Sequence, residues 1–209
     1  MSEIQDFCSI LTAVRRRAAD VGTSRHPVLE RLVEAARVQF GAASQDGRDI
    51  VEILRRDGQL VMVRKQRYMF LPAVPQRELR LASLDVNLVA SPPSMHLAIM
   101  QFMFDEAEKL CCLGMRFETP SGQGGGAHDF HHAQLLSALG RKVVLPNCPA
   151  WLPDSQPSFP LDASGPVELL ICAIASNYGA KMIGELRKYA PCIWARSKAM
   201  KLGALLEPA

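Results

Sequence analysis

Four prolines constrain the central part of this chain more than any other feature of the sequence. They are Pro72, Pro75, Pro92 and Pro93. A proline inside a helix removes a backbone hydrogen bond and clashes with the preceding turn, so no continuous helix can run through residues 47–93. This part of the chain has to fold as short elements separated by turns.

The stretches between these prolines have the composition of β-strands. Three runs are rich in β-branched, aromatic or alternating apolar residues: Gln59–Lys65, Tyr68–Leu71 and Glu78–Val89. They follow Asp57-Gly58, which is a typical hairpin turn. The sequence therefore predicts a meandering antiparallel sheet at the centre of the chain.

Helical patterns flank this sheet. In residues 3–21 the apolar positions recur at helical spacing: Ile4, Phe7, Cys8, Leu11 and Val14. A second amphipathic run begins near Pro27 and ends at Gly41, which favours an N-terminal helical hairpin. Two more helical runs follow Gly165, and Pro191 separates them from a basic tail.

The predicted fold class is α+β, with an N-terminal helical hairpin, a central antiparallel β-meander and C-terminal helices. We expect the hairpin to occupy residues 1–44. Residues 45–209 are predicted to form an α+β domain that contains a Pro-rich loop at 146–166 and ends in the C-terminal helices.

Residues 95–118 fit two structures. As a helix, they would carry one polar stripe that includes Gln101 and Asp105. As a hairpin, two alternating apolar sets would pair across an acidic turn at Asp105–Glu108, namely Ala98, Met100, Phe102 and Phe104 with Leu113, Met115 and Phe117. Periodicity alone does not decide between them. The hairpin is favoured because it would continue the sheet.

Composition excludes several classes of protein. The chain has 209 residues, of which 48% are hydrophobic, and this suffices for a substantial core. Its six cysteines are too dispersed for a disulfide framework, which favours a reducing cytoplasm. No apolar run approaches the roughly 20 residues of a membrane span. A net charge of +3 is mild for a dedicated nucleic-acid binder.

A histidine cluster is the densest group of chemically versatile side chains. His128, His131 and His132 follow a glycine run, and three of the five histidines therefore lie within five positions. If this segment is a helix, His128 and His132 share a face and could bind a divalent transition metal. The metalloprotease motif HExxH is not matched, because Asp129 stands where its glutamate would be. No cofactor is otherwise predicted.

Acid–base chemistry without a metal is the second interpretation of the cluster. If the segment is a strand, His132 and Gln134 share one face, with His131 on the other. Arg116 and Glu118 of a neighbouring strand could then point at the same place. Histidines that titrate near neutrality, with a cation to stabilise charge, suffice to cleave RNA. His96 is expected to be structural.

Two plainer interpretations remain. The glycine run could expose backbone N–H groups to an anion at a helix start. Alternatively, Gly122–Gly126 is a linker, and the histidines are the solvated start of an amphipathic helix that packs through leucines.

The leading functional hypothesis is a non-catalytic binding or accessory module within a larger cytoplasmic assembly of a bacterium. Trp151 and Phe159 in the Pro-rich loop are candidate docking residues. Trp194, Arg196 and Lys198 in the basic tail combine apolar and cationic groups, as many interfaces do. The expected partner is another protein or an assembly, with nucleic acid as the alternative and no membrane. The rival hypothesis is a small hydrolase, most plausibly a nuclease, that uses His128, His131, His132, Arg116 and Glu118.

Overall fold

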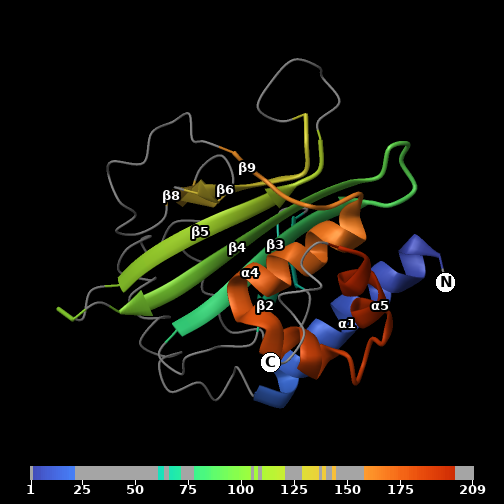
Figure 1. The fold of residues 1–209 in the computed structure, drawn as a ribbon. Coiled ribbons are helices and arrows are strands. Elements are labelled where there is room, and N and C mark those ends of the chain that lie inside the picture. Colours follow the sequence, from blue (N-terminus) through green and yellow to red (C-terminus); the bar gives the residue numbers. More distant parts are fainter. Residues whose placement is uncertain are drawn as a thin grey trace.

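The computed structural model describes residues 2–21, 61–63, 66–71, 78–104, 106–107, 110–120, 129–136, 138–139, 143–144 and 158–200. In this part of the chain, seven strands form one sheet in the order β1-β2-β3-β4-β5-β6-β9 (Figure 1). They are β1 (Val61–Val63), β2 (Gln66–Leu71), β3 (Glu78–Asn87), β4 (Ser94–Phe104), β5 (Leu110–Glu118), β6 (His132–Leu136) and β9 (Phe159–Pro160). Every neighbouring pair is antiparallel, and β7 (Ala138–Leu139) and β8 (Val143–Val144) form a separate pair.

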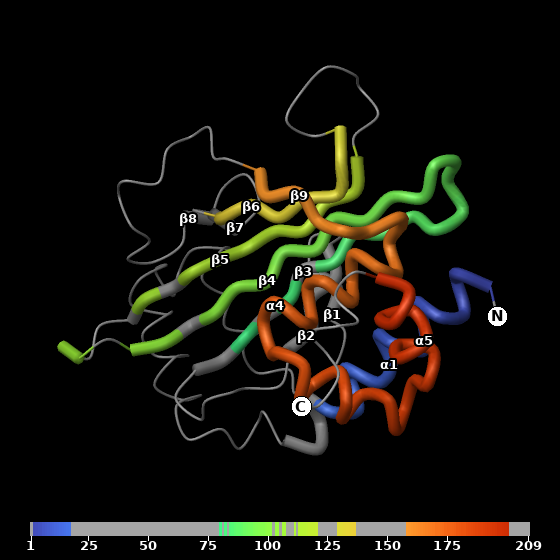
Figure 2. Tube along the Cα trace, in the orientation of Figure 1, coloured from blue at the N-terminus to red at the C-terminus, as the bar shows by residue number. Residues whose placement is uncertain are grey.

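Three helices pack together on one side of this sheet. Helix α4 (Pro166–Leu186) crosses the sheet, with α1 (Glu3–Val21) and α5 (Cys192–Ala199) beside it (Figures 1 and 2). The predicted α+β class is confirmed, with an N-terminal helix, a central antiparallel meander and C-terminal helices. The second helix of the predicted N-terminal hairpin lies outside the described residues. None of the described helices is both long and apolar enough to span a membrane.

The hydrophobic core lies between the sheet and the helices. Alternate residues of the central strands point into it: Ala82, Leu84, Leu97, Ile99, Phe117 and Ala133. Helix α1 contributes Phe7 and Ile10 to the same core, and α4 contributes Leu169 and Ile171. Each large apolar side chain that is fully buried stabilises the fold by about 1.5–3 kcal/mol.

The division at residue 44 stays a prediction, because the residues on both sides of it are outside the described part.

The buried face of α1 differs from the predicted one. Phe7, Ile10 and Val14 are buried, whereas the predicted Ile4 is 43% exposed and Cys8 is exposed. Ile10 was not part of the predicted set. The contact of α1 with α4 and α5 decides which side of the helix is covered. The spacing of apolar residues along the sequence cannot reveal that contact.

The β4–β5 pair confirms the hairpin over the helix for residues 95–118. The predicted pairing of the two apolar sets is wrong. Ile99 lies opposite Met115, and Ala98 lies opposite Arg116. Because directly opposite residues share a face, Ala98 and Met115 point to opposite sides of the sheet.

Helix α4 consists of two helical runs that meet at a kink, as the sequence predicts. Gly179 has φ +72° and ψ −178°, a conformation that is essentially restricted to glycine. Arg80 of β3 donates a hydrogen bond to the carbonyl of Asn177 just before the kink, and its guanidinium lies 4.5 Å from the Tyr178 ring centroid. A cation at the C-terminal end of a helical run complements the helix dipole.

Candidate functional site

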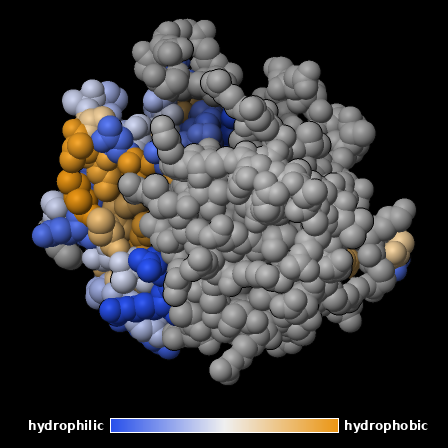
Figure 3. Space-filling model, turned by 180° about the vertical axis from the view of Figure 1, so that it is seen from behind, coloured by the Kyte–Doolittle hydropathy of each residue, from blue (hydrophilic) through white to orange (hydrophobic). Residues whose placement is uncertain are grey.

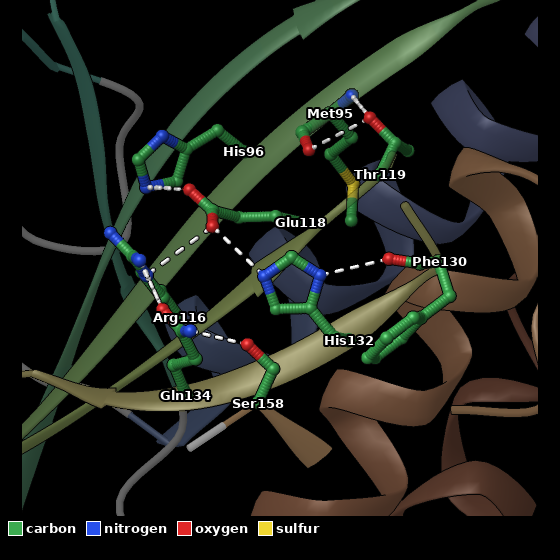
Figure 4. Close-up of polar contacts among 9 residues, drawn as sticks. All are labelled: Met95, His96, Arg116, Glu118, Thr119, Phe130, His132, Gln134 and Ser158. Carbon is green, nitrogen blue, oxygen red and sulfur yellow. Dashed lines mark hydrogen bonds and ion pairs between the residues drawn. The ribbon is translucent and has the colours of Figure 1, made fainter. Parts of the chain in front are cut away.

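Three adjacent strands carry polar side chains on the face of the sheet opposite to the helices. The register places His96 of β4 opposite Glu118 of β5, and Glu118 opposite His132 of β6. One row further along, Arg116 lies opposite Gln134. Because opposite residues in an antiparallel pair point to the same side, all five side chains share one face. Together with Ser158 they form the sheet-face cluster (Figure 4).

Glu118 is at the centre of this cluster. Its Oε1 lies 3.4 Å from His96 Nε2, and its Oε2 lies 3.2 Å from His132 Nε2. Arg116 Nε is 3.3 Å from the same Oε2 (Figure 4). One carboxylate therefore faces three groups that can each be cationic.

Each ring nitrogen of His132 lies against a hydrogen-bond acceptor. Nδ1 lies 2.8 Å from the carbonyl oxygen of Phe130, which can only accept a hydrogen bond, so Nδ1 carries a proton. Nε2 faces the Glu118 carboxylate, which also accepts. Both ring nitrogens donate when the ring is an imidazolium.

A second chain of hydrogen bonds extends along the cluster. Arg116 Nε donates to Gln134 Oε1 at 2.7 Å, and its Nη2 donates to the same oxygen. The Gln134 amide nitrogen donates in turn to the hydroxyl of Ser158. These bonds tie β5, β6 and the start of β9 together and hold the Arg116 guanidinium beside Glu118.

Exposure increases across the cluster from His132 to His96. The exposed fraction of the side chain is 1% for His132, 19% for Glu118, 29% for Arg116 and 52% for His96. A molecule in solution could reach His96 and Arg116, and Glu118 to a smaller extent. It could not reach the buried His132 directly, and His132 could influence such a molecule only through its contact with Glu118.

The structure brings together some of the predicted catalytic residues and separates others. Arg116, Glu118 and His132 converge, as expected if the histidine segment is a strand. The helical interpretation is wrong where the chain is described, because His132 begins strand β6.

His128 lies outside the described residues, so the proposed pair of His128 and His132 as metal ligands is untested as a pair. Within the described ranges, no group of three or more histidine, cysteine, aspartate or glutamate side chains could hold a metal ion.

His131 belongs to the helix side of the sheet. Its carbonyl accepts a hydrogen bond from Leu161 N–H at 2.8 Å. Burial lowers the pKa of His131, and this effect outweighs the nearby Glu168 carboxylate, which acts in the opposite direction. His131 and His132 are neighbours in sequence but lie in different environments, since successive residues of a strand alternate between faces.

Arg196, one of the predicted docking residues, is part of a second charged group. Its Nη2 lies 2.8 Å from Asp6 Oδ2, and its Nη1 lies 2.9 Å from Glu168 Oε1. Asp6, Glu168 and Arg196 form the helix cluster, which connects α1, α4 and α5. The hydrogen bond to Asp6 raises the pKa of Arg196, although burial acts against it. The Arg196 guanidinium thus already binds two carboxylates of its own chain.

The other predicted docking residues of the tail form a surface. The guanidinium carbon of Arg187 lies 5.0 Å from the Trp194 ring centroid, and Lys198 Nζ lies 5.6 Å from it. Lys188, which follows Arg187 in the sequence, is also exposed. Arg187, Lys188, Trp194 and Lys198 are called the basic surface below.

Exposed apolar side chains are distributed over several described elements. Phe159 of β9 is 50% exposed, Val89 in the β3–β4 turn is 85% exposed and Ile4 is 43% exposed. Seen from behind, the hydrophobic residues gather at the edge where the N-terminal end of the chain lies, with hydrophilic residues close beside them (Figure 3). Trp151 lies outside the described residues. Single exposed apolar residues are ordinary on protein surfaces and do not by themselves mark a site.

His96 is the residue of the site that the sequence did not reveal. It is separated from Glu118 by a turn and most of two strands, and only the β4–β5 register brings the two together.

Comparison with family models, with curated proteins and with solved structures finds no match. The function is therefore inferred from the chemistry of the site and of the basic surface.

Proposed function

We propose that this protein is a non-catalytic binding or accessory module within a larger cytoplasmic assembly of a bacterium. The observation that supports this proposal most strongly is the basic surface, which is formed by the turn after α4 and by α5. Its three cations are exposed, and none of them forms an ion pair with another described residue. Exposed cations around an aromatic residue are a frequent composition of protein interfaces.

The sheet-face cluster also supports binding over catalysis. Its groups are bonded to one another, and His96 and Arg116 both lie against the same Glu118 carboxylate. In a displacement at phosphorus the attacking and leaving oxygens are in line, so the base and the acid have to stand on opposite sides of the phosphate. His96 Nε2 and Glu118 Oε1 are only 3.4 Å apart and would stand on the same side.

The binding function is tested by the native mass of the protein in its host. The tagged wild-type chain is expected to migrate well above its own mass of 23.0 kDa. The double charge reversal Arg187→Glu/Lys198→Glu is expected to release it from the assembly. Arg15→Glu/Arg16→Glu, an equal charge change at exposed positions of α1, serves as the matched control and should retain the assembly. A wild-type chain that migrates alone, or equal behaviour of both variants, would refute the proposal.

A second candidate function is hydrolysis of RNA at the sheet-face cluster. It is favoured by the convergence of a carboxylate, an exposed histidine and an arginine. Glu118 would take the proton of a ribose 2′-hydroxyl as its oxygen bonds to phosphorus. Because His96 stands on the same side as Glu118, the departing 5′-oxygen would take its proton from solvent as that bond breaks, and Arg116 would stabilise the charge on phosphorus.

This second function is tested with a labelled RNA and purified protein. Glu118→Gln is expected to reduce cleavage by at least about 100-fold, because proton transfer by one positioned group contributes about 10²–10⁴-fold. Arg15→Ala, at an exposed position of α1 on the helix side of the sheet, is the control and should cleave at the wild-type rate. If wild type cleaves no RNA, or if Glu118→Gln cleaves equally well, the hydrolase hypothesis is wrong.

A further inference from the structure

The charges near the C-terminal end of the described chain are unevenly balanced. Residues 180–199 contain five cations and one acid: Lys181, Arg187, Lys188, Arg196 and Lys198, with Glu185. Arg196 is neutralised in the helix cluster, and Glu185 is paired with Arg17 at 2.7 Å. Four exposed cations therefore remain without an ion pair in the described structure, three of them in the basic surface. Positive potential on this scale attracts and orients anionic partners.

Trp194 holds two of these cations in place. The ring is partly buried against the core, so its position is defined by packing. Arg187 and Lys198 both lie over it. A cation–π contact of this kind reduces the freedom of a long side chain, and side chains that are ordered beforehand cost less entropy when they bind a partner.

The same contacts argue against two other anionic partners. A single-stranded nucleic acid binds through bases that stack on open aromatic faces, but the Trp194 ring already has its own cations over it and packs against the core. A membrane surface binds through aromatic side chains that insert among lipids, which a ring packed in this way cannot do. A net charge of +3 is also low for either partner.

We infer that the basic surface binds an acidic segment of a partner protein. This inference rests on the proposed binding function and specifies the chemistry of the partner. Glutamate and aspartate side chains of the segment would pair with Arg187, Lys188 and Lys198. The bidentate geometry of Arg187 would contribute the most directional of these contacts.

The experiment uses Trp194 as its own reporter. The chain has two tryptophans, so Trp151→Phe leaves Trp194 as the only fluorophore of this kind. The full-length variant is titrated with a twelve-residue peptide of alternating glutamate and serine. A saturable change in fluorescence is expected, with an affinity that falls as salt rises. The peptide of alternating lysine and serine should cause no such change.

Variants of this reporter chain locate the binding site. Arg187→Glu/Lys198→Glu is expected to weaken binding by at least about tenfold, since each reversal replaces an attraction with a repulsion. Arg15→Glu/Arg16→Glu should bind like the reporter chain. The neutral pair Arg187→Gln/Lys198→Gln, which disturbs folding less, should lie between the two. Equal binding by all variants would overturn the inference.

Two further probes distinguish the partner classes. A dodecamer of thymidylate and vesicles that contain phosphatidylserine are titrated under the same conditions. Tighter binding of either probe than of the acidic peptide would overturn the inference in favour of nucleic acid or lipid. If the charge reversal releases the native assembly but wild type binds no acidic peptide, the binding function stands and the acidic-partner assignment fails. If the assembly survives the charge reversal, the proposed function itself fails.

Discussion

The sheet-face cluster and the helix cluster are charged groups of opposite composition. In the first, one carboxylate of Glu118 faces Arg116, His96 and His132. In the second, the one guanidinium of Arg196 is shared by two carboxylates, from Asp6 and Glu168. Both clusters connect elements that are distant in sequence, but only the sheet-face cluster has a side chain that is half exposed.

This difference in exposure marks the sheet-face cluster as a candidate functional site and the helix cluster as a structural feature. The carboxylates of the helix cluster are nearly buried, with exposed fractions of 6% for the Asp6 side chain and 10% for Glu168. Asp6 Oδ1 is buried and has no hydrogen-bond partner. Both carboxylates pair with the single guanidinium of Arg196, which links three helices. The sheet-face cluster, by contrast, is accessible to solvent through His96, whose side chain is 52% exposed.

The largest expected effect is therefore on the helix cluster. Arg196→Met should lower the free energy of unfolding by about 3 kcal/mol, because it leaves two buried carboxylates without their cation. Urea denaturation measures this value. Arg15→Met, at an exposed position of α1, is the control and should change it by less than about 0.5 kcal/mol. A loss below about 1 kcal/mol for Arg196→Met would mean that the helix cluster does not hold the helices together.

The second-largest effect tests the increase in side-chain exposure from His132 to His96 within the sheet-face cluster. His132→Ala should lower the free energy of unfolding by about 2–3 kcal/mol, since it opens a cavity, leaves the Phe130 carbonyl without its donor and removes one of the groups that contact Glu118. His96→Ala removes a half-exposed side chain and should cost less than about 1 kcal/mol. The pair is compared by urea denaturation. Equal losses would show that His96 is as structural as His132.

A smaller effect is expected from Arg116→Lys. The ammonium group cannot reproduce the planar fork that contacts both Gln134 and Glu118, so about 1 kcal/mol of stability should be lost although the charge is kept. Arg15→Lys is the matched control, with no expected change. Thermal and urea unfolding of both variants provide the measurement. No loss for Arg116→Lys would mean that charge alone matters in the sheet-face cluster.

The smallest expected effect is on the pH dependence of stability, and it concerns His131 on the helix side of the sheet. Burial lowers the pKa of His131 in the folded state below the ordinary value of 6.5. The unfolded chain therefore binds a proton more readily, and this residue removes stability as pH falls through 6.5 toward the folded-state pKa. Replacing it in His131→Gln should make unfolding less sensitive to pH between 7 and 5. If the stability of wild type relative to His131→Gln stayed constant or increased as pH falls from 7 to 5, the assignment would be contradicted.

The sequence predicted most of the sheet and part of the site. The prolines and alternating residues indicated the strands up to Asn87, and the two faces of a strand predicted that His132 and Gln134 would meet Arg116 and Glu118. Both inferences depend on period and on immediate neighbours, which are local properties. The buried stripe of α1 was predicted only in part: Phe7 and Val14 are buried, whereas Ile4 and Cys8 are exposed, because the elements that pack against a helix select which apolar side is covered.

What the sequence determined by itself is the alternation of faces in each strand and the helical character of both ends. Only the tertiary structure decided that His96 joins Glu118, that Arg196 is used internally by Asp6, and that Arg187 and Lys198 meet over Trp194. The physical reason is distance along the chain. Asp6 and Arg196 are 190 residues apart in sequence, and no local pattern records which side chains a register or a helix contact will bring together.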